Sequence, residues 1–309
     1  MTQLRFSSFI NLDMEFFMKS SIFKRTAIVA ALAAIGSVAH AAEWSDTSLS
    51  ERVGQRFCEP YEGCSIGKHI FNLTNVSGYA YGTNFISIDM LDSDANDPSA
   101  QKAPSNSTAG AQEAYVVYRN TVDFSKFTAS PLSYAGVVRS LGATAGFDWN
   151  TKNDSYGSKK QMEVVGPTVM FNVPGFLNFS VLELFETNAP ATTPTRYTYK
   201  PHAALDLAFG IPVNVGPAKF SVEGYWDYID RKGTLEPSTA GTIGNNSGRE
   251  NHFDGRIMYD VSGLVNSKAK TFQVGVEYEF WKNKFGNLVS DVGAGARAST
   301  PMVRGEYHF

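Results

Sequence analysis

Apolar and polar residues alternate over about ten positions in several parts of the chain. In HAALDLAFGI (202–211), the apolar side chains of Leu205, Leu207 and Phe209 alternate with small or polar residues. The stretches TNFISIDML, KFSVEGYWDY, HFDGRIMYDV and TFQVGVEYEF follow the same pattern. Since successive side chains of a β-strand point to opposite faces, this period of two predicts strands with one apolar and one polar face.

Two kinds of all-β protein contain such strands. A soluble sandwich buries the apolar faces in its core, whereas a transmembrane barrel turns them to lipid and keeps the polar faces around a wet lumen. The segments match the ~9–11 residues of a membrane strand better than the ~5–6 residues of an average strand. Aromatic residues stand near the segment ends, where the girdles of a barrel lie: Tyr118, Trp149, Trp226, Tyr228, Phe280 and Tyr307. The pattern therefore predicts an all-β fold, a transmembrane antiparallel β-barrel.

The segments amount to about twelve strands, an even number as in bacterial barrels. They are expected near 45–57, 66–77, 83–91, 112–120, 136–149, 161–172, 176–187, 200–211, 218–230, 251–261, 271–282 and 300–309. Long polar connections, such as 92–111 and 231–250, alternate with short ones, such as 173–175. Long outer loops and short periplasmic turns are usual in outer-membrane barrels. The connection 121–135 is longer than we expect for a periplasmic turn.

The C-terminal stretch VRGEYHF continues the alternation to the last residue. The odd-numbered positions include the apolar or aromatic residues Val303, Tyr307 and Phe309, and the even-numbered positions include the polar residues Arg304 and His308. Closing a barrel pairs its last strand with its first, which removes both sheet edges. Tyr307 and Phe309 then face lipid, and they resemble the signal by which the barrel-assembly machinery recognises its substrates. The alternative is an ordinary C-terminal strand of a soluble protein.

The N-terminal region predicts export. After Met18 come a basic stretch with Lys24 and Arg25, the apolar run 26–38, and the small residues Ala39 and Ala41. This order is typical of a secretory signal peptide, here 18–41. The alternative is a membrane anchor, but the apolar run is shorter than the ~20 residues that span a bilayer.

Three further expectations follow from this N-terminal region. Residues 1–17 fit no part of a signal peptide, so we predict that translation starts at Met18. Residues 42–309 are then a single barrel domain. Its predicted location is the outer membrane of a Gram-negative bacterium.

Cys58 and Cys64 are the two cysteines of the chain. In an exported protein this C-x5-C pair is expected to form a disulfide; a metal pair or a redox pair is the alternative. No P-loop, H-E-x-x-H or G-x-S-x-G motif is present. We therefore predict that the protein is not an enzyme and holds no cofactor or metal. A barrel hydrolase would need a serine and a histidine side by side on an outward face.

The polar faces of the predicted strands carry both signs of charge. The formal net charge of the chain is −3, so the composition does not predict a basic surface that would bind nucleic acid. Charges of both signs across a wet pore orient polar solutes and tune selectivity; the alternative is that they merely neutralise one another. The predicted lumen residues are Asp89, Arg119, Asp206, Glu223, Tyr225, Asp254, Arg256, Glu277, Arg304 and Glu306. Tyr115, Tyr225 and Trp281 add ring faces that would suit a planar base.

Several stretches resemble the nucleoside-specific outer-membrane channel family, the Tsx-type porins. They are WSDTSLSERVGQRFCEP, KHIFNLTNVSGYAYGTNFISIDMLDSD, AYVVYRN and GATAGFDWNTKND. The resemblance implies a monomeric barrel with a narrow lumen through which nucleosides diffuse. The predicted function is thus an outer-membrane channel for small polar solutes, nucleosides among them. Its expected partners are outer-membrane lipid, the assembly machinery and the solute. The alternative is a structural or surface-binding barrel without selective transport.

Overall fold

The computed structural model describes residues 42–309 except 101–108, 129–131, 194 and 234–247. The predicted start and signal peptide lie outside the described residues. Residues 42–309 form one compact unit. No helix among the described residues is long and apolar enough to cross a bilayer.

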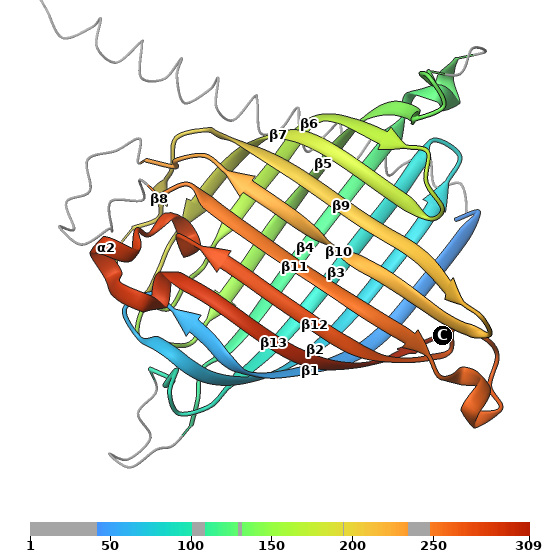
Figure 1. The fold of residues 1–309 in the computed structure, drawn as a ribbon. Helices are drawn as coiled ribbons and strands as arrows, with labels where there is room; N and C mark the ends of the chain where they lie inside the picture. Colours follow the sequence, from blue (N-terminus) through green and yellow to red (C-terminus); the bar gives the residue numbers. More distant parts are fainter. Residues whose placement is uncertain (1–41, 101–108, 129–131, 194, 234–247) are drawn as a thin grey trace, which may run out of the picture. The chain divides into compact units, whose positions relative to one another are not determined.

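Long antiparallel strands make up this unit (Figure 1). They are β1 (Trp44–Glu59), β2 (Gly63–Tyr79), β3 (Gly82–Ser93), β4 (Gln112–Asp123), β5 (Val138–Lys152), β6 (Gln161–Phe171), β7 (Phe176–Asn188), β9 (His202–Val215), β10 (Ala218–Ile229), β11 (Glu250–Asp260), β12 (Phe272–Lys282) and β13 (Arg297–His308). A two-residue strand, β8 (Tyr197–Thr198), pairs with the end of β7 in the following loop. The predicted number of barrel strands is confirmed, with boundaries shifted by a few residues.

The sheet closes on itself. Each long strand pairs with the next long strand along the chain, including β6 with β7 and β7 with β9. The last strand pairs with the first, with Tyr307 opposite Leu49, and the backbone N–H of Phe309 donates to the carbonyl of Thr47 over 3.0 Å. The terminal strand therefore has the partner that its backbone groups require, and the barrel has no free edge.

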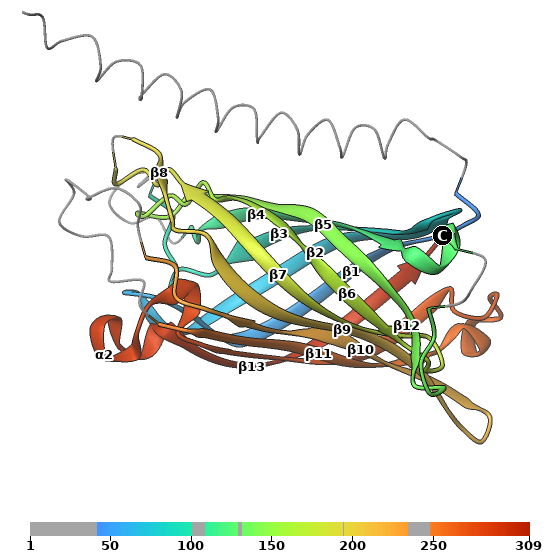
Figure 2. The ribbon, with the colours of Figure 1, turned by 90° about the horizontal axis from the view of Figure 1, so that it is seen from above.

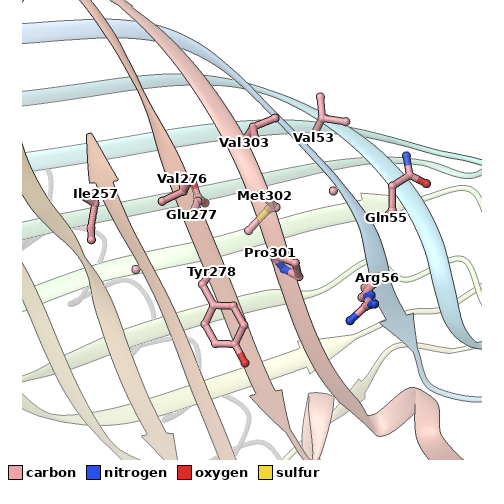
Figure 3. Close-up of a pocket in the computed structure, with 12 residues that line it drawn as sticks. Val53, Gln55, Arg56, Ile257, Val276, Glu277, Tyr278, Pro301, Met302 and Val303 are labelled. Atoms are coloured by element: carbon pink, nitrogen blue, oxygen red, sulfur yellow. The ribbon is translucent and has the colours of Figure 1, made fainter. Parts of the chain in front are cut away.

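Side chains alternate between an inner and an outer wall. Along β13, Met302, Arg304 and Glu306 are buried, whereas Val303 and Tyr307 are exposed. Apolar residues line shallow grooves on the outer wall, as Figure 3 shows for Val53, Val276, Pro301 and Val303. An apolar exterior around a polar interior is the reverse of a soluble protein and is the arrangement of a barrel in the bacterial outer membrane.

The two ends of the barrel differ. At one end, which we call the loop end, lie the long connections, including that between β12 and β13 with α2 (Val289–Val292). At the other, the turn end, residues 80–81, 172–175 and 216–217 join strands directly. Two connections of the turn end are longer and contain 3-10 turns, η1 (Phe124–Phe127) and η2 (Ser262–Val265). Figures 1 and 2 show the C-terminus at the end opposite to α2.

One ion pair lies on the outer wall. Glu51 Oε1 is 2.9 Å from Nδ1 of His69, and both side chains are exposed. Phe71 stands opposite Glu51 on the neighbouring strand, and Val53 stands opposite His69. In the middle of β1 this pair faces lipid, where an ionisable group without a partner is costly.

We expect His69→Ala to lower the free energy of unfolding by about 1–2 kcal/mol, because Glu51 then faces lipid without a partner. The double variant Glu51→Ala/His69→Ala should recover most of the loss. Urea titration of the barrel in lipid vesicles, followed by tryptophan fluorescence, measures both. A loss below about 0.5 kcal/mol, usual for a pair exposed to water, would contradict the lipid-facing position.

Candidate solute pathway through the lumen

The inner wall carries all the residues predicted to line the lumen. They are Asp89, Arg119, Asp206, Glu223, Tyr225, Asp254, Arg256, Glu277, Arg304 and Glu306. Their position follows from the strand alternation, because residues between them on the same strands face lipid. Their part in solute passage stays a prediction.

The first charged group joins four strands. Arg52 donates to both carboxylate oxygens of Asp89, over 3.2 and 2.9 Å, and its Nε lies 3.2 Å from Glu277. Arg304 contacts Glu277 over 3.0 Å and Glu306 over 2.9 Å. The side chains of Glu277 and Arg304 are each only 2% exposed, so removing either takes one of two partners from a buried charge.

Arg52 is a lumen residue that the sequence analysis missed. Further along β1, the register slips by a residue between Gly54 and Phe57. Gly54 and Phe57 are nevertheless both buried, although they stand at positions of opposite parity. A bulge of this kind interrupts strict alternation. The alternation in this segment therefore did not indicate which face Arg52 occupies.

Two further arginines have carboxylate partners. Arg119 lies 2.6 Å from Asp148, which also accepts a hydrogen bond from the Tyr115 hydroxyl over 2.9 Å. Arg256 lies 2.6 Å from Glu223, and both side chains stay partly exposed inside the barrel, at 24% and 29%. Water in the lumen therefore reaches this pair.

Other carboxylates of the inner wall have no cationic partner. Asp206 stands directly opposite Asp227 on the neighbouring strand, and Asp254 stands opposite Glu279. Among the described residues, no Lys or Arg nitrogen lies within 4.0 Å of these four carboxylates. Like charges directly opposite each other destabilise a sheet. The β9–β12 side of the lumen is thus an acidic wall, defined by these four residues.

Aromatic rings lie next to the acidic wall. His252 stacks on Trp281 with ring centroids 3.8 Å apart, and Tyr225 meets His252 edge-on at 5.1 Å. Tyr115 lies elsewhere on the inner wall, with the Lys160 ammonium 5.5 Å from its ring centroid. The predicted ring faces are therefore inside the barrel, although Trp281 is partly covered by His252.

Part of the inner wall is apolar. On β6, β7 and β9, inward side chains form a buried cluster of Met162, Val164, Leu182, Leu184 and Ala204. A polar inner face was expected for every strand. The segment 161–172 therefore carries apolar residues on both faces.

Charged side chains also meet at the loop end. Glu59 Oε1 lies 2.6 Å from Lys68, 3.3 Å from Lys284 and 3.6 Å from Lys152. Lys152 in turn lies 2.9 Å from Asp97, a buried residue of the β3–β4 loop. Since β1 and β5 are separated by three strands, the contact between Glu59 and Lys152 reaches across the mouth of the barrel.

A second group of charges lies beside the first. Lys232, in the loop after β10, is 3.0 Å from Glu186 of β7 and 3.0 Å from Glu250 of β11. Burial opposes the charge of Lys232, but these two carboxylates outweigh it and raise the pKa above its usual value. Alternation does not extend into loops, so the sequence contained no signal for Lys232, Lys284 or Asp97.

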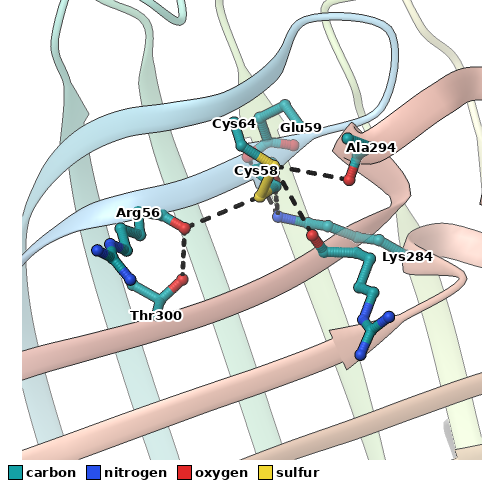
Figure 4. The surroundings of a disulfide bond; sticks show 8 residues. Arg56, Cys58, Glu59, Cys64, Lys284, Ala294 and Thr300 are labelled. Carbon is teal, nitrogen blue, oxygen red and sulfur yellow. Dashed lines mark hydrogen bonds and ion pairs between the residues drawn. A yellow bond between two sulfur atoms is a disulfide. The ribbon is translucent and has the colours of Figure 1, made fainter.

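The disulfide is confirmed. Cys58 and Cys64 are bonded and close the tip of the β1–β2 hairpin (Figure 4). The carbonyl of Cys58 accepts a hydrogen bond from Lys284 over 2.9 Å, and that of Arg56 accepts one from Thr300 over 2.9 Å. Within the described ranges, His, Cys, Asp and Glu form no group of three or more that could hold a metal ion.

Comparisons with known proteins add little to this description. No family model matches the sequence, and no curated protein matches it. Solved structures found to be similar include the KdgM porin, with 11% identity over 85% of this chain and 99% of that chain and a TM-score of 0.38. The NanC porin matches with 10% identity over 84% and 98% and a TM-score of 0.39. The beta domain of the Bordetella autotransporter Brka matches with 8% identity over 86% and 98% and a TM-score of 0.38.

These values assign neither a family nor a function. The resemblance to nucleoside-specific channels therefore stays a prediction.

Proposed function

We propose that the protein is an outer-membrane channel through which small polar solutes diffuse. The observation that supports this most is the charged inner wall, on which Arg256 and Glu223 stay partly exposed inside a closed barrel. A barrel that served only as a membrane anchor would need no such row of charges, because an apolar core is cheaper to bury. One barrel encloses the whole pathway, so we propose that the channel works as a monomer.

Nucleosides are the solutes that we propose first. The stretches that resemble nucleoside-specific channels support this, and so do the rings of Tyr115, Tyr225 and Trp281 on the inner wall. Bases stack on aromatic rings, and ribose hydroxyls bond to carboxylates such as Asp206. Single-channel conductance of the purified protein in planar bilayers tests the proposal. Added nucleosides should reduce the current, whereas free ribose should do so less.

A second candidate is a structural or surface-binding barrel. The ion pairs that cross the loop end favour it, because Glu59, Lys152 and Lys284 fill space that a solute would need. This candidate predicts a folded barrel that conducts no ions under any condition.

The acidic wall predicts a cation preference. The arginines of the inner wall already have carboxylate partners, and no described Lys or Arg nitrogen lies within 4.0 Å of Asp206, Asp227, Asp254 or Glu279. Rings of acidic side chains select cations. We expect the reversal potential in a KCl gradient to show a several-fold preference for K⁺ over Cl⁻. Asp227→Asn should bring the permeability ratio of K⁺ to Cl⁻ closer to one, whereas Asp92→Asn, a change on the outer wall, should not. Anion preference in the unaltered protein would contradict the expectation.

A further inference from the structure

The connection between β12 and β13, residues 283–296, folds onto the loop end of the barrel. It contains η3 (Lys284–Gly286), α2 and η4 (Gly293–Ala296), and all of it is described. A Cβ on Gly295 would collide with the backbone carbonyl of Glu59, and Sγ of Cys64 lies 3.6 Å from the carbonyl oxygen of Ala294. The connection therefore packs closely on the disulfide-bonded tip of the β1–β2 hairpin.

Lys284 fastens this connection to the hairpin. Its Nζ donates to the carbonyl of Cys58 over 2.9 Å and lies 3.3 Å from Glu59 Oε1, and its side chain is only 6% exposed (Figure 4). The same carboxylate oxygen contacts Lys68 of β2 and Lys152 of β5. A single side chain thus ties the connection to charges that reach across the mouth.

The backbone at the start of the connection is strained at Phe285. Its φ of 58° lies in the left-handed region that bulky residues seldom adopt, whereas Asn283, with a φ of 55°, is of a residue type that tolerates it. The Phe285 N–H donates to Glu250 over 3.1 Å, and the Lys284 ammonium lies 5.1 Å from the Phe285 ring centroid. Contacts made in the folded-in position therefore offset the strain of this backbone.

Two physical effects would favour an outward position of the connection. A buried ion pair gains little over the same charges in water, and outward movement of the connection would hydrate Lys284 and relieve the strain. We propose that residues 283–296 are a gate over the mouth, that the Lys284–Glu59 pair is its latch, and that the Cys58–Cys64 disulfide holds Glu59 in place. This inference rests on the proposed channel function.

The first test replaces the latch. Lys284→Met removes the charge and leaves an unbranched side chain that is one atom shorter. Its matched control is Lys282→Met, two residues earlier, where the side chain is exposed on the outer wall. In planar bilayers we expect the open fraction to rise about tenfold for Lys284→Met, the effect of losing one hydrogen bond to a charged group. The control should behave like the unaltered protein.

The second test needs no variant, so it does not depend on folding of an altered chain. Tris(2-carboxyethyl)phosphine, which does not cross bilayers, is added to one side of the reconstituted wild-type channel. Reduction from the side of the loop end should raise the open fraction, whereas addition at the turn end should not. Alkylation of Cys58 and Cys64 after the recording verifies that the disulfide was reduced.

The outcomes separate the gate from the channel. In one outcome the wild-type protein conducts, while neither Lys284→Met nor verified reduction of the disulfide changes the open fraction. That result overturns the gate and leaves the channel function intact. If the folded wild-type protein, verified by its heat-modifiable mobility, carries no current and neither change induces any, both proposals fail. Current that appears only after the latch or the disulfide is removed supports both.

Discussion

Deletion of Phe309 is expected to reduce the folded, heat-modifiable protein in the outer membrane several-fold. The residue pairs edge-on with Tyr307 at 5.0 Å, and its N–H bonds to Thr47 across the closing seam. Burying a phenylalanine in an apolar phase contributes ~1.5–3 kcal/mol. We expect the larger part of the effect to be kinetic, because the terminal aromatic is the residue that we propose the assembly machinery recognises.

The control for this experiment is the residue before it. His308 lies on the inner wall, within 2.8 Å of Asp46 and 3.1 Å of Glu306, and does not face lipid. His308→Ala should therefore affect assembly much less. The strains compared produce the unaltered protein, the Phe309 deletion and His308→Ala. Membrane fractionation and gels of unboiled samples measure the amount of folded protein in the outer membrane of each. If His308→Ala impairs assembly while deletion of Phe309 leaves it unchanged, the assignment of inner and outer faces at the C-terminus is wrong.

Arg304→Met should lower the free energy of unfolding by about 3 kcal/mol, because it takes the shared cation from two buried carboxylates. Glu277 keeps Arg52 and Glu306 keeps His308, but neither carboxylate is exposed by more than 6%. Arg256→Met should cost no more than about 1 kcal/mol, because its pair with Glu223 is reached by water in the lumen. Urea titration in lipid vesicles gives both values.

A double variant separates the lost pairing from a simple packing defect. Arg304→Met/Glu277→Gln removes one of the two buried carboxylates that lose Arg304 in the single variant. It should therefore be more stable than Arg304→Met alone. Equal losses for Arg304→Met and Arg256→Met, or no recovery in the double variant, would show that the lumen is hydrated at both arginines.

The fold could be predicted from the sequence because each strand separates lipid from lumen residue by residue. At 303 and 304 a valine faces outward and an arginine faces inward, and a shift of one position would reverse both. The cost of placing a charge in lipid therefore fixes the face of almost every strand residue. Boundaries were less certain: β5 covers Val138–Lys152 rather than 136–149, because pairing across a sheet, and not alternation, decides where a strand ends.

The candidate site could be predicted only in part. Alternation placed Asp89, Glu277 and Arg304 on the inner wall, but it did not indicate that Arg52 joins them. The loop residues Asp97, Lys232 and Lys284 were not predicted, since an aperiodic segment does not reveal where its side chains point.

The sequence by itself determined the strands, the inner and outer walls, the closing C-terminal strand and the cysteine pair, because each depends on local alternation or on a short spacing. Only the tertiary structure decided which charges meet. Asp206 faces Asp227 while Asp148 receives Arg119, and Glu59 reaches Lys152 across three intervening strands. The register between strands and the curvature of the closed sheet fix these distances, and both depend on all the strands together.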